Sequence, residues 1–389
     1  MGWWRVCPNG LLLLDDLLKL PKPGGVHFIA YADDVTIAIE ASSRSDIERK
    51  ATTILSSVSE WSIRNRLTFS AGKSITMTHK GKFKRAPTVK MLGSSIATVS
   101  QARVLGVILD DARSYVQHAS FIGERASAGF GKMSRLSAST WGVRYHALKI
   151  LYTGTYVAMI TYAAAVWYRR SSVYAVRSSL LRTQRPALML LTKAYRTAST
   201  AALPVLAGVL PADLEVLRAG RFAEESKSLA VKERRKKQAE IRAAVLALWQ
   251  ERWENSQDGR DMFGFFPDVR TRLCSQWVEP DYMVSQILIG HGCFRARLHR
   301  LGLCDSAMCP CGYEPETRDH ALWDCELYSE ERTTMIDGLK RTGIGPVYHS
   351  DLVSCVTSLR TRSNIVVLCS RPRKGRGEIE NGDEITCRE

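Results

Sequence analysis

The stretch Val26-His27-Phe28-Ile29-Ala30-Tyr31-Ala32-Asp33-Asp34-Val35-Thr36-Ile37-Ala38-Ile39 decides the fold of the first part of the chain. Apolar residues recur at every second position on both sides of its centre, which is the pattern of half-buried strands. We therefore predict a β-hairpin with two adjacent carboxylates, Asp33 and Asp34, at its turn. Aspartate is common in turns because its side chain hydrogen-bonds the nearby backbone. Two fixed neighbouring carboxylates also suit Mg²⁺, which prefers oxygen ligands.

The composition is that of a globular protein with polyanionic partners. The chain has 389 residues, of which 45% are hydrophobic and 24% charged, enough for two or three domains with their own cores. A net charge of +16 favours nucleic acid as a partner, with an anionic membrane surface as the second choice. Half of the ten cysteines fall between Cys293 and Cys325. Such clustering is typical of metal binding inside the cell and not of an extracellular disulfide scaffold.

The sequence predicts no membrane partner. No long apolar region with a small-residue cleavage site follows the first residues, so we expect no signal peptide. The uncharged stretch 150–168 has about the length of a bilayer span. It contains threonines and tyrosines, however, and would be the only span in a basic chain. We interpret it as a buried helix.

Residue patterns predict the elements that follow the hairpin. Ser43 and Asp46 have the spacing of a capping box and open a helix with an apolar stripe. The stripe consists of Ile47, Ala51, Ile54, Val58 and Trp61. Residues 67–74 are predicted to form a strand, a turn that carries Lys73, and a second strand, and residues 104–110 a single buried strand. Helices of a bundle are predicted over 121–139, 144–168 and 173–192.

A basic stretch separates Glu60 from Asp110, with nine lysines and arginines and no acidic residue. Solvated faces normally mix charge signs, so backbone phosphates are the natural complement of this stretch. The candidate contacts are Arg64, Arg66, Lys80, Lys82, Lys84, Arg85 and Lys90.

A second basic cluster, Arg234-Arg235-Lys236-Lys237, lies in a long amphipathic helix predicted over residues 218–249. A solvated helix face, a nuclear-localisation signal and a nucleic-acid contact are all compatible with it. Interspersed glutamates favour the solvated face.

Four residues near the end have the spacing of a metal site. Cys309, Cys311, His320 and Cys325 form the pattern Cys-x-Cys-x8-His-x4-Cys, two close pairs of the ligands that tetrahedral structural Zn²⁺ takes. Cys304 could replace one of them. Free buried thiols beside an unrelated histidine are the alternative interpretation.

These features together resemble a known family. Tyr31-Ala32-Asp33-Asp34 between two apolar arms resembles the palm hairpin of reverse transcriptases. Residues 202–211 and 286–300, with the cysteine–histidine pattern that follows, resemble the non-LTR (type-1) retrotransposon polymerases of insect rDNA-targeting elements. The resemblance implies an α+β fold with a partial palm at 1–112, a helical thumb at 113–215, a charged helical connector at 216–284, a zinc-knuckle domain at 285–335 and a largely disordered tail at 336–389.

The resemblance also implies a reaction, RNA-directed DNA synthesis by two-metal nucleotidyl transfer. Asp33 and Asp34 would hold Mg²⁺, and Lys73 and Asn9 would face the nucleotide, with Asn9 at the position of a family glutamine. The partners would be an RNA template, a DNA primer or target DNA and deoxynucleotides, and the location nuclear.

One departure from the family pattern limits the expected activity. Family members carry a further metal-binding Asp on an earlier palm strand, preceded by fingers, and this chain begins almost at the segment of Asn9. We therefore expect the isolated chain to be inactive. A non-catalytic nucleic-acid-binding protein derived from such an element is the alternative.

Overall fold

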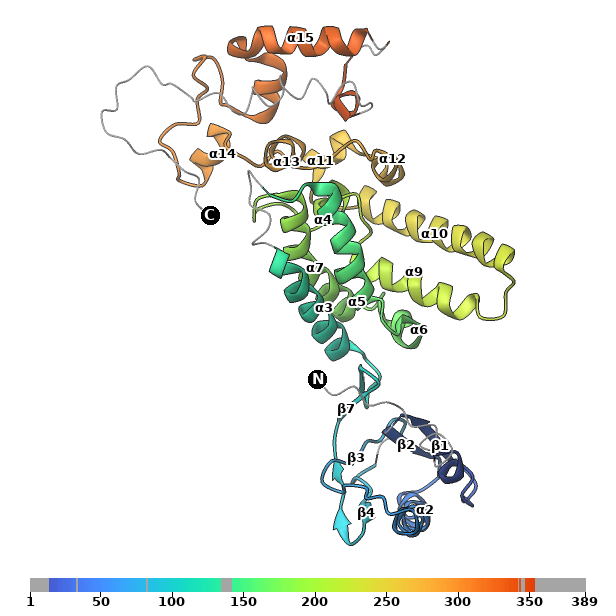
Figure 1. The fold of residues 1–389 in the computed structure, drawn as a ribbon. Coiled ribbons are helices and arrows are strands. Elements are labelled where there is room, and N and C mark those ends of the chain that lie inside the picture. Colours follow the sequence, from blue (N-terminus) through green and yellow to red (C-terminus); the bar gives the residue numbers. More distant parts are fainter. Residues whose placement is uncertain are drawn as a thin grey trace. The chain divides into compact units, whose positions relative to one another are not determined.

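The computed structural model describes residues 14–32, 34–81, 83–133, 142–341, 343 and 347–353. The chain divides into two compact units, residues 1–118 and 119–389, whose elements are shown in Figure 1. The described part is mixed α+β, mostly helical with small two-stranded sheets. The α+β class predicted from the sequence is confirmed at this level.

The first unit is built on the predicted hairpin. Strand β1 (Val26–Tyr31) pairs antiparallel with β2 (Asp34–Ile39), so that Tyr31 faces Asp34 across a two-residue turn. Ala32 in this turn has a φ of 53°, as the tight turns of hairpins require. The inner face of the hairpin, with the partly buried residues Phe28, Val35 and Ile37, packs against a core of Leu17, Val58 and Trp61.

Helix α2 (Arg44–Arg64) packs against the hairpin through its apolar stripe. The Ser43 side chain accepts a hydrogen bond from the backbone N–H of Asp46 at 3.2 Å, so the predicted cap is confirmed. Four of the five stripe residues are buried. The indole N–H of Trp61 donates to Asp16 at 2.9 Å, which ties the helical turn at residues 14–18 to α2.

Three further two-stranded sheets belong to this unit. They are β3 (Ile75–Thr76) with β6 (Ala97–Thr98), β4 (Lys90–Met91) with β5 (Ser94–Ser95), and β7 (Gln101–Val104) with β8 (Val107–Asp110). The prediction of one strand over 104–110 is wrong, because Leu105 and Gly106, with φ of 46° and 83°, form a turn between β7 and β8. The first strand predicted in 67–74 is also absent, and Phe69 packs on Trp61 instead.

The second unit is helical. Its elements are α3 (Val116–Gly131, which begins in the first unit), α4 (Tyr145–Tyr152), η2 (Thr153–Val157), α5 (Ala158–Ile160), α6 (Ala164–Trp167), η3 (Tyr168–Arg170), α7 (Tyr174–Thr192), α8 (Ala202–Leu206), α9 (Ala212–Glu225), α10 (Val231–Glu254), α11 (Arg260–Phe265), α12 (Val269–Cys274), α13 (Tyr282–Ile289), α14 (Arg295–Arg300), η4 (His320–Asp324), η5 (Glu326–Tyr328), α15 (Ser329–Lys340) and η6 (His349–Val353). The helices predicted over 121–139 and 173–192 correspond to α3 and α7, although residues 134–139 lie outside the described part.

The single helix predicted over 144–168 is wrong. The chain runs from α4 through the π-helical segment η2 into α5, and then turns at Ala163, whose φ is 48°. The indole N–H of Trp167 donates to the Tyr162 carbonyl at 3.4 Å across this turn. Within the described residues no single helix is long and apolar enough to cross a bilayer, and Tyr145–Ile160 with Ala164–Arg170, bent by 49°, meets that test only as a pair.

The long helix predicted over 218–249 is also wrong, because it is two helices. Helix α9 ends at Glu225, and α10 begins at Val231 after a short connection. The two pack together as a hairpin, which Figure 1 shows extending from the other helices of this unit. The carboxylate of Glu233 accepts a hydrogen bond from the backbone N–H of Ala230 at 3.2 Å, which caps the N-terminus of α10.

Replacement of Gly220 with alanine is expected to destabilise the helical unit by about 2–3 kcal/mol. A Cβ at Gly220 on α9 would lie 2.2 Å from the Cβ of Tyr168, so the two segments would have to separate. Helical Gly154 has open space around it, and Gly154→Ala is the matched control, expected to be neutral or stabilising. Equal urea midpoints for Gly220→Ala and the wild type would contradict the close packing.

Candidate metal centre and acidic hairpin

The acidic hairpin presents one described carboxylate to solvent. Asp34 is exposed at the start of β2, and its neighbour across the turn, Tyr31, is 67% exposed. Asp33 lies outside the described residues. The alternation of the strands fixes the position of Asp34, because the partly buried Val35 and Ile37 pack against the core. A carboxylate in this position is open to a hydrated cation.

The other predicted nucleotide-facing residues are not joined to this carboxylate by any described contact. Lys73 is exposed in the turn before β3, where its backbone N–H donates to the Ser70 carbonyl at 3.2 Å. The side chains of Lys73 and Asp34 take part in no hydrogen bond or ion pair with a residue that the structure describes. Asn9 lies outside the described residues.

The predicted basic surface is exposed to solvent. One acidic residue from another part of the chain contacts it. Arg64, Arg66, Lys80, Lys84, Arg85 and Lys90 are all exposed, and Lys82 lies outside the described residues. Glu48 of α2 reaches this stretch, because its carboxylate accepts the backbone N–H of Thr88 at 2.7 Å. That hydrogen bond, with the charges of Arg44 and Arg85, lowers the pKa of Glu48. Tertiary packing thus brings an acid to a stretch that has none in sequence.

The structure brings together the four cysteine and histidine side chains. Their three sulfur atoms and one imidazole nitrogen all lie within 4.8 Å of one another. The Sγ atoms of Cys309 and Cys325 are 3.6 Å apart, and Sγ of Cys311 is 3.3 Å from Nε2 of His320. In a tetrahedral zinc site with Zn–S bonds of about 2.3 Å, neighbouring ligand atoms are about 3.8 Å apart. Small side-chain adjustments would therefore fit the cluster around one ion.

Two short segments place these ligands. Gly312, with a φ of 88°, lets the chain turn back after Cys311, and the Cys309 N–H donates to the Glu314 carbonyl at 2.8 Å. The segment η4 carries His320 and is followed by Cys325, whose N–H donates to the His320 carbonyl at 2.8 Å. Nδ1 of His320 lies 3.6 Å from the Glu314 carboxylate, the kind of outer contact that orients a metal-bound imidazole.

The thiols differ in their readiness to ionise. Burial raises the pKa of Cys309 to about 12. At Cys311 burial opposes ionisation, but hydrogen bonds from the Tyr313 backbone, from Cys309 and from His320 lower the pKa to about 7. Cys304 lies outside the group, because its thiol donates to the carbonyl of Ser306 at 3.2 Å. The described geometry thus favours Cys309, Cys311, His320 and Cys325 as the ligand set.

The residues that anchor this cluster to the helices are not evident in the sequence. Arg318, only 9% exposed, lies 3.2 Å from the Asp261 carboxylate of α11 and over the ring of Phe265 at 5.5 Å. Asp319 contacts His349 at 3.0 Å. No local sequence pattern indicates these pairs, because the two residues of each pair are 30 or more positions apart in sequence.

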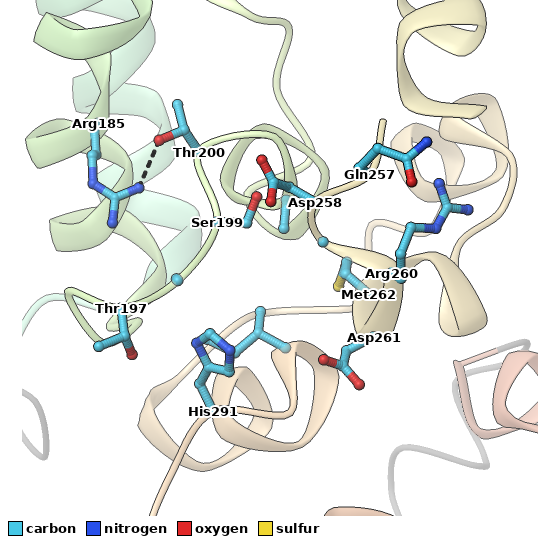
Figure 2. A pocket seen from close by; sticks show the side chains of 14 residues that line it. Arg185, Thr197, Ser199, Thr200, Gln257, Asp258, Arg260, Asp261, Met262 and His291 are labelled. Atoms are coloured by element: carbon cyan, nitrogen blue, oxygen red, sulfur yellow. Dashed lines mark hydrogen bonds between the residues drawn. The ribbon is translucent and has the colours of Figure 1, made fainter. Parts of the chain in front are cut away.

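A cavity of about 530 Å³ in the helical unit was also not predicted. It lies between residues 197–202, residues 257–262 and the turn that carries His291 (Figure 2). Arg185 donates to Thr200 at 2.8 Å at one wall, and Asp261 and His291 lie at another. Burial is the main cause that lowers the pKa of His291. The lining mixes both charge signs, so the cavity favours no single class of ligand.

Comparison with known proteins identifies relatives over most of the chain. It is 31% identical over 352 residues to the retrovirus-related Pol polyprotein from type-1 retrotransposable element R1 of Bradysia coprophila, covering 84% of this chain and 35% of the relative. Two such polyproteins of Nasonia vitripennis are 30% identical over 348 residues, covering 85% of this chain and 83% of the relative, and 31% identical over 326 residues, covering 79% and 95%.

The length of the match differs among relatives. The chain spans about a third of the Bradysia polyprotein and of the "Putative 115 kDa protein in type-1 retrotransposable element R1DM" of Drosophila melanogaster. No family model matches the chain, and no solved structure matches it. The identity over most of the chain, together with the coverage of the Nasonia relatives, decides the family: the chain belongs to the Pol polyproteins of R1 type-1 retrotransposable elements.

Proposed function

We propose that the chain works in RNA-directed DNA synthesis, as part of the polymerase of an R1-type retrotransposable element. Membership of the Pol family carries the proposal, and the solvent-facing Asp34 at the tip of a packed hairpin supports it. Asp33 and Asp34 would hold Mg²⁺, whose role is to stabilise charge on the reacting phosphate oxygens. Lys73 and Asn9 would contact the nucleotide, and the exposed basic residues 64–90 would contact the duplex.

The proposed domains follow the family pattern. Residues 1–112 would be palm-like, 113–215 thumb-like and 216–284 a connector, and residues 285–335 would form a zinc knuckle followed by a tail. The cysteine–histidine cluster would hold a structural Zn²⁺, since closed sites with four nitrogen and sulfur ligands stabilise small folds. The chain would be located in the nucleus, because DNA synthesis at a chromosomal target site takes place there.

The described residues support nucleic-acid binding more directly than catalysis. Among them the cysteine–histidine cluster is the one group of three or more side chains that could hold a metal, and Asp34 is the one carboxylate of the hairpin tip that they include. Two-metal catalysis needs ligands for two ions. We therefore expect the 389-residue chain to bind a primed RNA template with little or no extension, which keeps a non-catalytic binding function as the second candidate.

Replacing both Asp33 and Asp34 with asparagine tests the role of the hairpin. The double variant should bind a primed RNA template within about twofold of the wild type, because carboxylates repel phosphates and act only through metal. Binding is measured by fluorescence anisotropy, and extension by gel electrophoresis with Mg²⁺ and deoxynucleotides. Loss of binding in the double variant would contradict the proposed metal role. Extension by the wild type that the double variant lacks would show a complete polymerase centre and exclude the binding-only candidate.

A further inference from the structure

The first half of α10 carries an arginine stripe for which the described residues provide no acidic partner. We define this arginine stripe as Arg235, Gln238 and Arg242, with Arg234 at its border. All four side chains are exposed. At 100° per residue and a rise of 1.5 Å, Arg235 and Arg242 lie on one face of the helix about 10 Å apart. Gln238 lies between them on the same face.

The two acids in the first half of α10, Glu233 and Glu240, point away from the stripe. Glu233 accepts the N–H of Ala230, and Glu240 forms an ion pair with Lys237 at 2.9 Å, while Lys237 also approaches Glu225 of α9 at 3.9 Å. Glu233 and Glu240 precede Arg235 and Arg242 by two positions, which rotates each about 200° away around the helix. Glu233 and Glu240 therefore lie on the side of α10 opposite the stripe.

The stripe continues the buried face of the same helix. Trp249 lies seven residues after Arg242 and is 3% exposed, and Leu246, four residues after it, is 8% exposed. This face is covered by the helical unit in the second half of α10. In the first half of α10, the same helix face is exposed on the α9–α10 hairpin, which Figure 1 shows extending from the unit. None of the three arginines forms an ion pair or a side-chain hydrogen bond with any residue in the described ranges.

We propose that the arginine stripe of α10 binds the sugar–phosphate backbone of the nucleic acid on which the chain acts. This inference rests on the proposed function and specifies one of its contact surfaces. Guanidinium groups bind phosphate with paired hydrogen bonds and are weakly hydrated, so arginines without partners on one exposed face suit a polyanion. The amide of Gln238 adds a donor between the two charges. Each phosphate contact releases counterions, which makes its contribution measurable by salt dependence.

The test compares two double variants that each remove two positive charges from the same exposed stretch. Arg235→Gln with Arg242→Gln alters the stripe, and Lys236→Gln with Lys237→Gln alters the face that carries the glutamates. Glutamine keeps the helix propensity of both residue types, and circular dichroism confirms folding. Affinity for a primed RNA template is measured from 50 to 200 mM salt, with vesicles of anionic lipid as a separate arm.

The arginine variant should bind about tenfold more weakly at low salt, with the magnitude of the log–log salt slope reduced by about two. The lysine variant should stay within about twofold. Equal effects of the two variants would overturn the inference in favour of diffuse charge, and so would loss of vesicle binding alone by the arginine variant. An unchanged slope in the arginine variant would overturn this inference only, whereas a wild-type chain that does not bind the template would overturn the proposed function as well.

Discussion

Replacing Cys325 with serine is expected to abolish stoichiometric zinc binding and to unfold the segment around the cluster. Cys325 is fully buried, and its sulfur is 3.6 Å from that of Cys309. A serine hydroxyl is a poor zinc ligand. Structural zinc contributes about 10–16 kcal/mol of apparent binding free energy in small zinc-binding peptides, so losing a ligand removes a large part of the stability of this segment.

Loss of zinc in the Cys325→Ser variant is also expected to affect the helices that contact the cluster. Arg318 and Asp319 hold the segment against Asp261 and His349, so the amides of α11 should also exchange faster when the metal is lost. Zinc content by atomic emission and amide exchange by mass spectrometry measure both effects. Cys304→Ser is the matched control, because Cys304 lies outside the ligand group, and it should keep one zinc per chain. A Cys325→Ser variant that keeps its zinc would exclude the ligand set.

Replacing Arg272 with methionine is expected to lower the free energy of unfolding by about 3–5 kcal/mol, because each buried carbonyl left without a donor costs roughly 1–3 kcal/mol. Arg272 of α12 is 1% exposed. Its guanidinium donates to the carbonyls of Leu206 at 2.7 Å, Val278 at 3.0 Å and Ser275 at 3.1 Å, which joins α8 to the segment after α12. Methionine fills a similar volume but leaves three buried carbonyls without these donors, and each unsatisfied group is costly.

The surroundings of Arg272 are closely packed, and an exposed arginine on the same helix provides a control. Gly208 has a φ of 53° and approaches the guanidinium so closely that a Cβ there would lie 3.0 Å from it. Arg270 is an exposed arginine two residues earlier on the same helix, and Arg270→Met should change stability by no more than ~0.5 kcal/mol. Urea denaturation gives both values. A midpoint for Arg272→Met equal to that of the wild type would show that the buried contacts carry no net stability.

Local patterns in the sequence predict the elements whose partners are near in the chain. The hairpin at 26–39 and α2 were predictable because apolar residues recur with periods of two and 3.6, and Ser43 marks the helix start. The ligand group was predictable because two close pairs of zinc-type ligands are uncommon by chance. Both features depend on spacing within a few dozen residues.

Features that depend on tertiary packing were not predictable. Arg272 is one of 55 lysines and arginines, and nothing nearby in sequence marks it as buried, because its partners at Leu206 and Val278 come from other segments. Apolar residues continue across Ala163 and across the connection after Glu225, so periodicity predicted one helix in each place where the structure has a break. In the sequence, glutamates alternate with the basic residues of α10, and this pattern favours a solvated face. The order of charges along the chain does not show which side of the helix each residue occupies until the helix ends are known.

Equilibrium binding of a primed RNA template to the folded, zinc-loaded chain tests the proposed role in nucleic-acid binding most directly. We expect saturable binding that weakens by about 10³-fold or more between 50 and 200 mM salt, because each phosphate contact releases counterions. We also expect uncharged competitors to leave this binding unchanged. If the folded chain with one bound zinc does not bind the template at 50 mM salt, the chain does not have the proposed role in RNA-directed DNA synthesis.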